Sequence, residues 1–299
     1  MRVTLDVFSG RKNPAWLLSE KNVNRLKERF AGRSLVEAEA VEAILGFRGF
    51  VVTAESDDQL PEGMPASFRI GGLLPADYSM PETTLRSLSA DDSVEAMRWL
   101  LTTGHHAISE DITAYIEDAI EMNNQDLESE SPTESAVEEK FWIEEAKLVE
   151  KATCVINNTP YNPGFWNAAG VMTKNNCYNY AMNYRSDTFA QPGRISGHPN
   201  SIMDCSHVGT AANWDGCKTT CSGSNKNVAL VIWPGYDYHW YRKHSEGFWG
   251  HKMGGTAAKN TDNLNRVING KTLTPQNCAR GPYTVFCGYR YSPTGMKVR

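Results

Sequence analysis

The sequence predicts an α+β fold built from two units. In the first half of the chain, short segments with alternating apolar and polar residues are interleaved with segments of helical periodicity. The second half is rich in Asn, Gly, Tyr and Trp, and its apolar runs have the length of strands. Charge divides the chain in the same way, because residues 1–150 have a net charge of −15 and residues 151–299 a net charge of +10.

Residues 1–130 are predicted to form a small, acidic α+β accessory domain without cysteine. Its first strand covers residues 3–8 and ends at the turn Ser9-Gly10. Helical spacing places Val23, Leu26 and Phe30 on one stripe of the next element. After the first strand, the expected elements are helices over residues 19–30 and 34–45, strands over 47–54 and 67–74, and helices over 89–102 and 109–122.

A polar, acidic linker over residues 123–133 is predicted to separate this domain from a second one over residues 135–299. A charged helix over 134–151 would open the second domain or bridge the two. The strands expected after it cover residues 228–233, 238–242, 248–252 and 283–289. The second and third of these form a hairpin, with His244 at the solvated tip of its loop.

Composition argues against a membrane span and against nucleic acid as a partner. No stretch approaches the ~20 apolar residues that a spanning helix needs. The basic side chains of the second half are scattered, and Arg242-Lys243 is their only adjacent pair. We expect instead that the acidic first half docks on the basic second half of the same chain.

All seven cysteines follow residue 150, and an odd number leaves at least one free thiol. Such a cysteine content would suit export to an oxidising compartment. The first ten residues, however, lack the basic start and the unbroken apolar run of a signal peptide, so the chain as written would be cytoplasmic. The sequence therefore leaves the localisation open.

Four residues offer an alternative zinc site. Cys217 and Cys221 have the spacing C-x3-C, and Cys205 and His207 lie nearby in the sequence. The Gly-rich tail that follows Cys221 is more typical of a loop pinned by a disulfide. We therefore expect no metal.

Cys177 is the candidate nucleophile. Asn176 is a good N-cap residue, which places Cys177 in the first turn of a helix. At that position the helix dipole and the free backbone N–H groups lower the pKa of a thiol and stabilise an oxyanion. The alternative is a small buried thiol in a helix that packs Tyr178, Ala181 and Met182 into the core.

His239 is the candidate base, and His251 would orient it. If the hairpin is centred on Ser245, His239 and His251 lie directly opposite each other on one face of the sheet, close enough to hydrogen-bond. This arrangement follows the nucleophile–base–orienter logic of a catalytic triad. Asn260 and Asp262 are alternative orienters, and the plainer alternative is a pair of ordinary strand histidines.

Several motifs resemble those of a little-characterised, mostly bacterial protein family. They are CYNYA at residues 177–181, TFAQPG at 188–193, DYHWYR at 237–242, WGHK at 249–252 and FCGY at 286–289. The segment Asp6 to Arg11 also resembles a small domain found beside such proteins. The order of Cys177, His239 and His251 is similar to that of NlpC-like and CHAP-type papain-fold cysteine hydrolases. This resemblance implies a papain-like (NlpC-like) catalytic domain over residues 135–299.

We therefore expect a cysteine-dependent hydrolase or acyl transferase that acts on a peptide or on an amide-bearing small molecule through a thioester. Cys177 would attack the acyl carbon, His239 would move the proton and His251 would hold the imidazole. No metal or organic cofactor is required. The residues expected to contact the oxyanion or the substrate are Asn176, Gln191 and Trp240.

Two other classes of function stay open. The first is a non-catalytic, disulfide-stabilised binding or matrix protein, in which Cys177 joins a bridge or packs inertly. The second is a structural zinc protein that uses Cys205, Cys217, Cys221 and His207.

Overall fold

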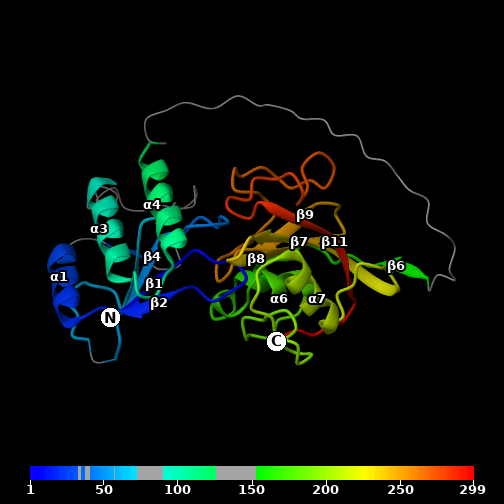
Figure 1. Ribbon diagram of the computed structural model, residues 1–299, viewed down its shortest axis with the longest axis horizontal. Coiled ribbons are helices and arrows are strands. Elements are labelled where there is room, and N and C mark those ends of the chain that lie inside the picture. The colour runs from blue at the N-terminus through cyan, green and yellow to red at the C-terminus, as the bar shows by residue number, and fades with distance from the viewer. Residues whose placement is uncertain (33–34, 38–40, 57, 73–89, 126–152) are drawn as a thin grey trace.

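The computed structural model describes residues 1–32, 35–37, 41–56, 58–72, 90–125 and 153–299, and its helices pack against two sheets (Figure 1). The predicted α+β class is therefore confirmed. The predicted domain boundary, most of the expected linker and the helix expected over 134–151 lie outside these residues. Within the described part of the chain, no helix is both long and apolar enough to cross a membrane.

The N-terminal sheet has the strand order β2-β1-β4-β5-β3, and all of its neighbouring strands are antiparallel. Alternate residues point into the core, as Phe50 and Val52 do on β4. The strands are β1 (Arg2–Leu5), β2 (Ala15–Leu17), β3 (Val36–Glu37), β4 (Phe50–Thr53) and β5 (Ser67–Ile70).

The helix predicted over residues 34–45 is wrong in the part that the structure describes. Val36 and Glu37 form β3, where they pair with Arg69 and Phe68 of β5. Residues 41–45 have no helical turns. Helix propensity is a weak preference, and strand pairing within the folded protein overrides it here.

The N-terminal helices match the sequence pattern closely. They are α1 (Glu20–Phe30), α3 (Ala90–Thr103) and α4 (Glu110–Gln125). The side chain of Ser19 caps α1 by accepting a hydrogen bond from the backbone of Asn22. The predicted stripe of Val23, Leu26 and Phe30 is buried, and it belongs to the same hydrophobic cluster as the strand residues of the N-terminal sheet.

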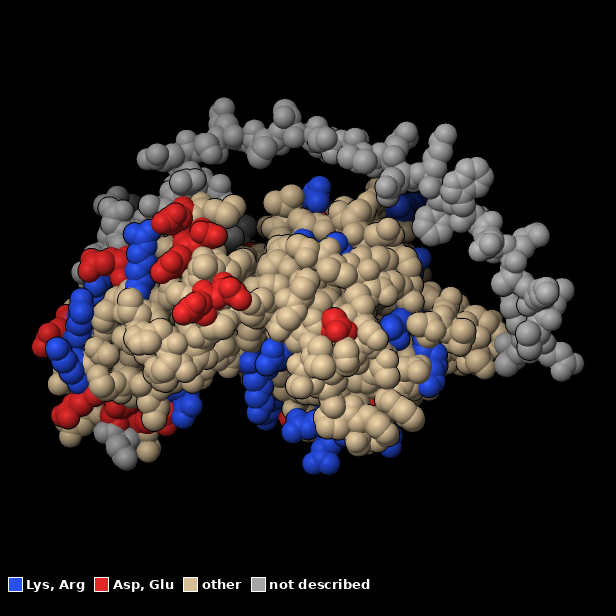
Figure 2. All heavy atoms as spheres, in the orientation of Figure 1, with Lys and Arg blue, Asp and Glu red and all other residues tan. Residues whose placement is uncertain are grey.

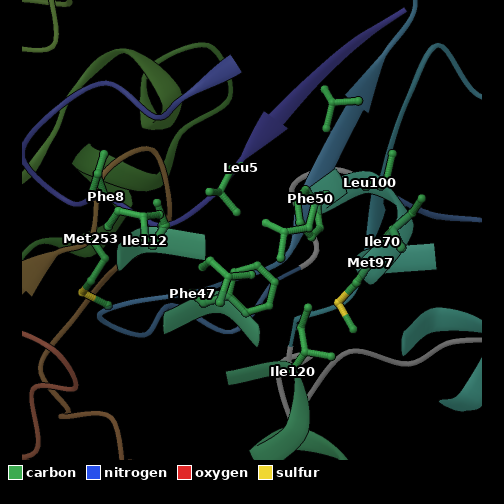
Figure 3. Packing of buried hydrophobic residues seen from close by; sticks show 14 of the residues in the cluster. Leu5, Phe8, Phe47, Phe50, Ile70, Met97, Leu100, Ile112, Ile120 and Met253 are labelled. Carbon is green, nitrogen blue, oxygen red and sulfur yellow. The ribbon is translucent and has the colours of Figure 1, made fainter. Parts of the chain in front are cut away.

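One hydrophobic cluster runs from the N-terminal sheet and helices into the C-terminal half. Figure 3 shows Leu5, Phe50 and Ile70 beside helix residues such as Leu100, with Phe8 and Met253 at one end of the cluster. The same cluster includes side chains of the C-terminal sheet, namely Ala229, Val231, Trp233, Tyr241 and Trp249. Each large apolar side chain buried in this way stabilises the fold by about 1.5–3 kcal/mol. The two halves are therefore held together by a shared core.

The C-terminal sheet has the strand order β10-β9-β8-β7-β11, and these strands are antiparallel to their neighbours. Strand β6 (Cys154–Ile156) lies parallel to the start of β7. The other strands are β7 (Gly223–Trp233), β8 (Asp237–Lys243), β9 (Trp249–Lys252), β10 (Ala258–Lys259) and β11 (Val285–Pro293). The strands predicted within 228–252 and 283–289 are present, and β7 and β11 are longer than expected.

Two helices lie on one face of this sheet (Figure 1). They are α6 (Cys177–Met182), which contacts β8, and α7 (Cys205–Asp215), which contacts β7 and β11. The side chain of Asp204 caps α7, and Gly216 ends it in the left-handed conformation that favours glycine. Two short segments precede α6, namely α5 (Pro163–Asn167) and the 3-10 helix η1 (Met172–Lys174).

The register predicted for the β8–β9 hairpin is wrong by two residues. His251 lies opposite Tyr241, and Lys243 lies opposite Trp249. The hairpin loop is therefore centred on Glu246 instead of Ser245. Because side chains alternate faces with a period of two, a shift of two residues keeps His239 and His251 on the same face. They become diagonal neighbours, which are still within reach of each other.

Acidic side chains gather on the N-terminal half, and basic ones line the lower edge of the C-terminal half (Figure 2). The described contacts between the halves include one ion pair, between Lys259 and Glu42 at 2.9 Å. Asn263 also exchanges two hydrogen bonds with the backbone of Leu45. The expected attraction between the oppositely charged halves stays a prediction, because these contacts do not measure long-range electrostatic attraction.

Candidate functional site

Asn176 and the start of α6 place Cys177 as the sequence predicts. The side-chain oxygen of Asn176 accepts hydrogen bonds from the backbone of Tyr178 and Asn179, and the Asn179 side chain bonds back to the backbone of Asn176. This reciprocal pair is a capping box. Cys177 is thus the first residue of the helix, and its side chain has no exposed surface.

The segment Ser9 to Arg11 of the N-terminal half lies directly against this helix start. A buried carboxylate, that of Asp237, accepts hydrogen bonds from the backbone nitrogens of Ser9 at 2.6 Å, Gly10 at 3.0 Å and Arg11 at 2.9 Å. The hydroxyl of Tyr283 donates to the same carboxylate at 2.5 Å. Burial raises the pKa of Asp237, and the hydrogen bonds from these donors lower it by a smaller amount.

The carbonyl oxygen of Gly10 is held by three side-chain donors. Asn176 donates to it at 2.8 Å, Gln191 at 2.8 Å and the hydroxyl of Tyr238 at 3.2 Å. Two of these are the residues expected to stabilise an oxyanion. They bind a carbonyl oxygen of the chain's own backbone instead. We call this arrangement of Asn176, Gln191, Tyr238 and Asp237 around Gly10 the Gly10 socket.

A buried ion-pair network fixes the backbone that leads into the socket. The Arg48 guanidinium donates to Asp6 at 2.7 Å and to the carbonyl oxygen of Phe8 at 2.8 Å. Arg69 donates to the second carboxylate oxygen of Asp6 at 3.0 Å. These two cations outweigh the effect of burial and lower the pKa of Asp6 to about 2. The loop is therefore anchored on both sides of Ser9.

Ser9 lies between the candidate nucleophile and the candidate base. Its hydroxyl is 2.5 Å from Nδ1 of His239, and it also interacts with the Cys177 thiol. The thiol donates a hydrogen bond to the carbonyl oxygen of Tyr238 at 3.9 Å. Among the described residues, the structure gives no hydrogen bond between Cys177 and His239.

The hydrogen-bond chain beyond Ser9 assigns the tautomers of both histidines. Nε2 of His251 is 2.8 Å from the carbonyl oxygen of Thr261, so this nitrogen carries the proton. Nδ1 of neutral His251 then accepts from Nε2 of His239 at 2.8 Å. Nδ1 of His239 therefore carries no proton, and it accepts a hydrogen bond from the Ser9 hydroxyl. His239 and His251 are thus joined by a hydrogen bond, whereas Asp262 binds Arg266.

The predicted low pKa of the Cys177 thiol is wrong. Burial is the largest effect and raises the pKa well above its usual value, and the nearby Asp237 carboxylate raises it further. Burial also lowers the pKa of His239 well below its usual value and that of His251 to about 3. The thiol and both imidazoles are therefore neutral at pH 7. The dipole of a six-residue helix does not offset complete desolvation.

Trp240 does not line a cleft as expected. It is fully buried, and its ring packs against that of Tyr178 at a centroid distance of 5.6 Å. Because neighbours on a strand point to opposite faces, Trp240 lies on the other side of β8 from His239. It serves the core between the sheet and α6.

Two disulfides exclude the alternative zinc site. Cys154 is bonded to Cys221, and Cys205 is bonded to Cys287, so two of the four expected ligands are unavailable for a metal. Cys217 is a buried free thiol, as are Cys177 and Cys278. The described residues contain no group of three or more ligand-type side chains that would hold a metal ion.

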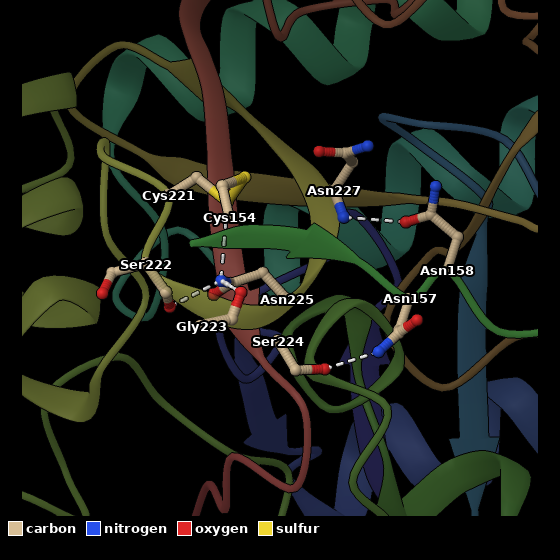
Figure 4. Close-up of a disulfide and its surroundings, with 9 residues drawn as sticks. All are labelled: Cys154, Asn157, Asn158, Cys221, Ser222, Gly223, Ser224, Asn225 and Asn227. Atoms are coloured by element: carbon tan, nitrogen blue, oxygen red, sulfur yellow. Dashed lines mark hydrogen bonds between the residues drawn. A yellow bond between two sulfur atoms is a disulfide. The ribbon is translucent and has the colours of Figure 1, made fainter. Parts of the chain in front are cut away.

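The Cys154–Cys221 bridge fastens β6 to the turn before β7 (Figure 4). Polar side chains support the same junction: Asn225 donates to the backbone of Ser222 and Gly223, and Asn157 donates to Ser224 at 2.7 Å. All three residues of β6 are exposed. The disulfide and these hydrogen bonds therefore hold a strand that makes little contribution to the core.

Sequence reasoning missed the part that Ser9, Asp237 and Tyr283 play in this site. Ser9 and Asp237 are 228 residues apart, and no local pattern signals such a contact. The sequence offers only an indirect signal, since Ser9 lies in the segment Asp6 to Arg11 and Asp237 begins the motif DYHWYR.

Comparisons with known proteins give one informative match. The insoluble matrix shell protein 1 of Ruditapes philippinarum is 41% identical over 135 residues, which span 44% of this chain and 88% of that protein. No protein-family model matches the chain. No solved structure matches it either.

Proposed function

Because the chain belongs to the family of the insoluble matrix shell protein 1 of Ruditapes philippinarum, we propose that it is a non-catalytic, disulfide-stabilised component of an extracellular matrix. The identity of 41% over 88% of that relative is the observation that carries the proposal. The same finding contradicts the expected cysteine hydrolase or acyl transferase. It favours the matrix protein that the sequence left open as an alternative.

A non-catalytic role is supported by the Cys177 cluster, whose hydrogen-bonding groups are already occupied by the chain itself. This cluster consists of Cys177, Ser9, His239 and His251. The donors that would bind a substrate carbonyl are occupied by Gly10. The acceptor nitrogen of His239 is occupied by Ser9. A substrate would have to displace a segment that is fixed by hydrogen bonds from both halves of the chain.

We further propose that the C-terminal half has a papain-like arrangement that serves as a scaffold. A helix that begins at Cys177 packs on an antiparallel sheet whose strands contain His239 and His251. This order of elements supports the proposal. The polar side chains of such a site then act as hydrogen-bonding partners that fasten the N-terminal segment.

The two disulfides support a durable protein in an oxidising compartment. They join residues that are 67 and 82 positions apart. In the chain-entropy model, a loop of this length adds about 4 kcal/mol to stability, because the unfolded chain loses freedom. One bridge fastens β6, and the other fastens the start of α7 to β11.

Fractionation of the source tissue tests the proposal. An antibody against the chain should detect it in the insoluble extracellular matrix, and mass spectrometry without reduction should find both disulfides. A cytosolic metabolic enzyme detected in the same fractions serves as the control. Recovery in the cytosolic fraction with all four of these cysteines reduced would contradict the proposal.

A further inference from the structure

We infer that a basic groove next to the Gly10 socket binds an acidic polysaccharide, a chain of sugar rings with sulfate or carboxylate groups. The groove consists of two hollows of about 430 and 470 Å³. Pro199 and Asn200 line both of them, so the hollows lie next to each other. This inference goes beyond the proposed matrix role and depends on the groove alone.

The first hollow is cationic. Arg11, Lys12 and Arg194 line it, and no Asp or Glu is among its described lining residues. Lys12 and Arg194 are exposed, and within the described part of the chain neither side chain has an acidic partner. A concave surface lined by one sign of charge concentrates ligands of the opposite sign. Few acidic side chains are visible along the lower edge of this half (Figure 2).

The Gly10 socket holds one of these cations in place. Asp237 binds the backbone nitrogen of Arg11, and one guanidinium nitrogen of Arg11 donates to the carbonyl oxygen of Tyr236 at 2.7 Å. The remaining donors of the guanidinium stay available, because Arg has five N–H groups. Preorganisation of this kind reduces the entropy lost when a sulfate or carboxylate group binds.

The second hollow offers an aromatic platform. Trp214, near the end of α7, is 58% exposed. The imidazole of His198 stacks on its ring with a centroid distance of 4.1 Å and an angle of 6° between the planes. A large exposed aromatic side chain held in one orientation provides a flat apolar surface with little entropy left to lose. The C–H face of a sugar ring matches such a surface.

Charge and platform together favour a glycan over an acidic peptide. The hydroxyl groups of Ser206 and Thr210 also line the second hollow, next to Trp214. A polyanionic glycan presents sugar faces and charged groups along one chain, so it can use both hollows at once. An acidic peptide would use only the cations.

The test is isothermal titration calorimetry at several salt concentrations with the intact, disulfide-bonded protein. The probes are a sulfated tetrasaccharide, neutral dextran and polyglutamate. We expect the tetrasaccharide to bind, dextran to bind weakly or not at all, and affinity to fall with salt because exposed charges are screened. Binding of the tetrasaccharide that is no tighter than that of dextran would overturn the inference. So would equal or tighter binding of polyglutamate, which would assign the groove to acidic peptides.

Matched variants locate the site. Lys12→Gln with Arg194→Gln should weaken tetrasaccharide binding by about tenfold, since it removes two of the three cations that line the first hollow. Lys21→Gln with Lys271→Gln removes the same charge from exposed positions outside the groove and should change affinity little. Equal losses in the two double variants would show that binding follows net charge and would overturn the site.

Trp214→Ala tests the platform separately. We expect it to lower affinity several-fold while the salt dependence stays as in the wild type, because no charge is removed. Thermal unfolding of each variant checks that it is folded. Unchanged affinity in folded Trp214→Ala would overturn the role of the aromatic platform and, with it, the preference for a glycan.

Discussion

At the scale of single residues, burial determines the state of Cys177. Cys177 does lie at a capped helix start, as the sequence predicts. The prediction that this position makes it a reactive thiolate is wrong. An exposed thiol would gain from the backbone N–H groups of the first turn. Cys177 has lost all contact with water, and the penalty for a buried charge is larger than that gain. Sequence shows the cap but not the depth at which the helix lies.

Alkylation of the folded protein checks this state. Cys177 should resist iodoacetamide from pH 6 to pH 9, because burial both blocks access and raises the thiol pKa. In guanidinium chloride it should react like a free thiol, which titrates near ~8.5. Peptide mass spectrometry reads the labelling. Rapid labelling of the native protein near pH 7 that His239→Ala abolishes would contradict the closed cluster.

Gly10 is required because its backbone passes close to an aromatic ring. A Cβ atom added at this position would lie 2.4 Å from Cε2 of Tyr238. Gly10→Ala should therefore lower the free energy of unfolding by about 1–3 kcal/mol, as overpacking does in other cores. Urea unfolding measures the change.

Gly164→Ala is the matched control for this substitution. The nearest atom to the added Cβ there is the side-chain oxygen of Asn162 at 3.8 Å, an ordinary contact. Stability should change by no more than about 0.5 kcal/mol. If Gly10→Ala were as stable as this control, the close approach of Tyr238 would not be present in solution.

At the scale of secondary structure elements, the β8–β9 hairpin shows how far pattern reading reaches. The strands and their faces follow from the alternation of side chains, but the centre of the loop depends on contacts outside the hairpin. His244, expected at a solvated tip, is buried and lies 2.8 Å from the hydroxyl of Tyr180. Its other nitrogen is 3.1 Å from the carbonyl oxygen of Thr159. These partners are distant in sequence, so the register error was not visible locally.

The two disulfides should differ in what they stabilise. Cys205→Ser with Cys287→Ser releases the start of α7 from β11 and should lower the free energy of unfolding by about 2–4 kcal/mol. Cys154→Ser with Cys221→Ser should mainly release β6, because its three residues are exposed. Hydrogen exchange should then increase in β6 and at the start of β7 while α6 stays protected. Equal loss of protection throughout the sheet in both variants would contradict this difference.

At the scale of the whole molecule, two halves with different compositions share one core. The sequence separates them by charge and cysteine content, and this division reflects their surfaces. Their interiors are continuous, since one apolar cluster contains Leu5 and Phe50 together with Val231 and Trp249. Composition does not reveal which apolar residues of one half pack against the other, because any apolar side chain can fill such a space.

A shared core predicts one cooperative unfolding transition. Differential scanning calorimetry should give a single peak whose van't Hoff and calorimetric enthalpies agree. Near-UV circular dichroism, which is dominated by the aromatic C-terminal half, should follow the same curve as far-UV circular dichroism. Two separated peaks would indicate that the halves unfold independently.

The Gly10 socket also sets an order of events during synthesis. Ser9 leaves the ribosome early, but Asp237 is made 228 residues later. At typical elongation rates this interval is roughly 10–50 s. During that time the edge of the nascent N-terminal half that carries Ser9 and Phe8 lacks its partner from the C-terminal half. A chaperone or a neighbouring chain can bind this edge instead. The contact between Ser9 and Asp237 is thus among the last to form, and protein yield should depend on how well that edge is protected during the interval.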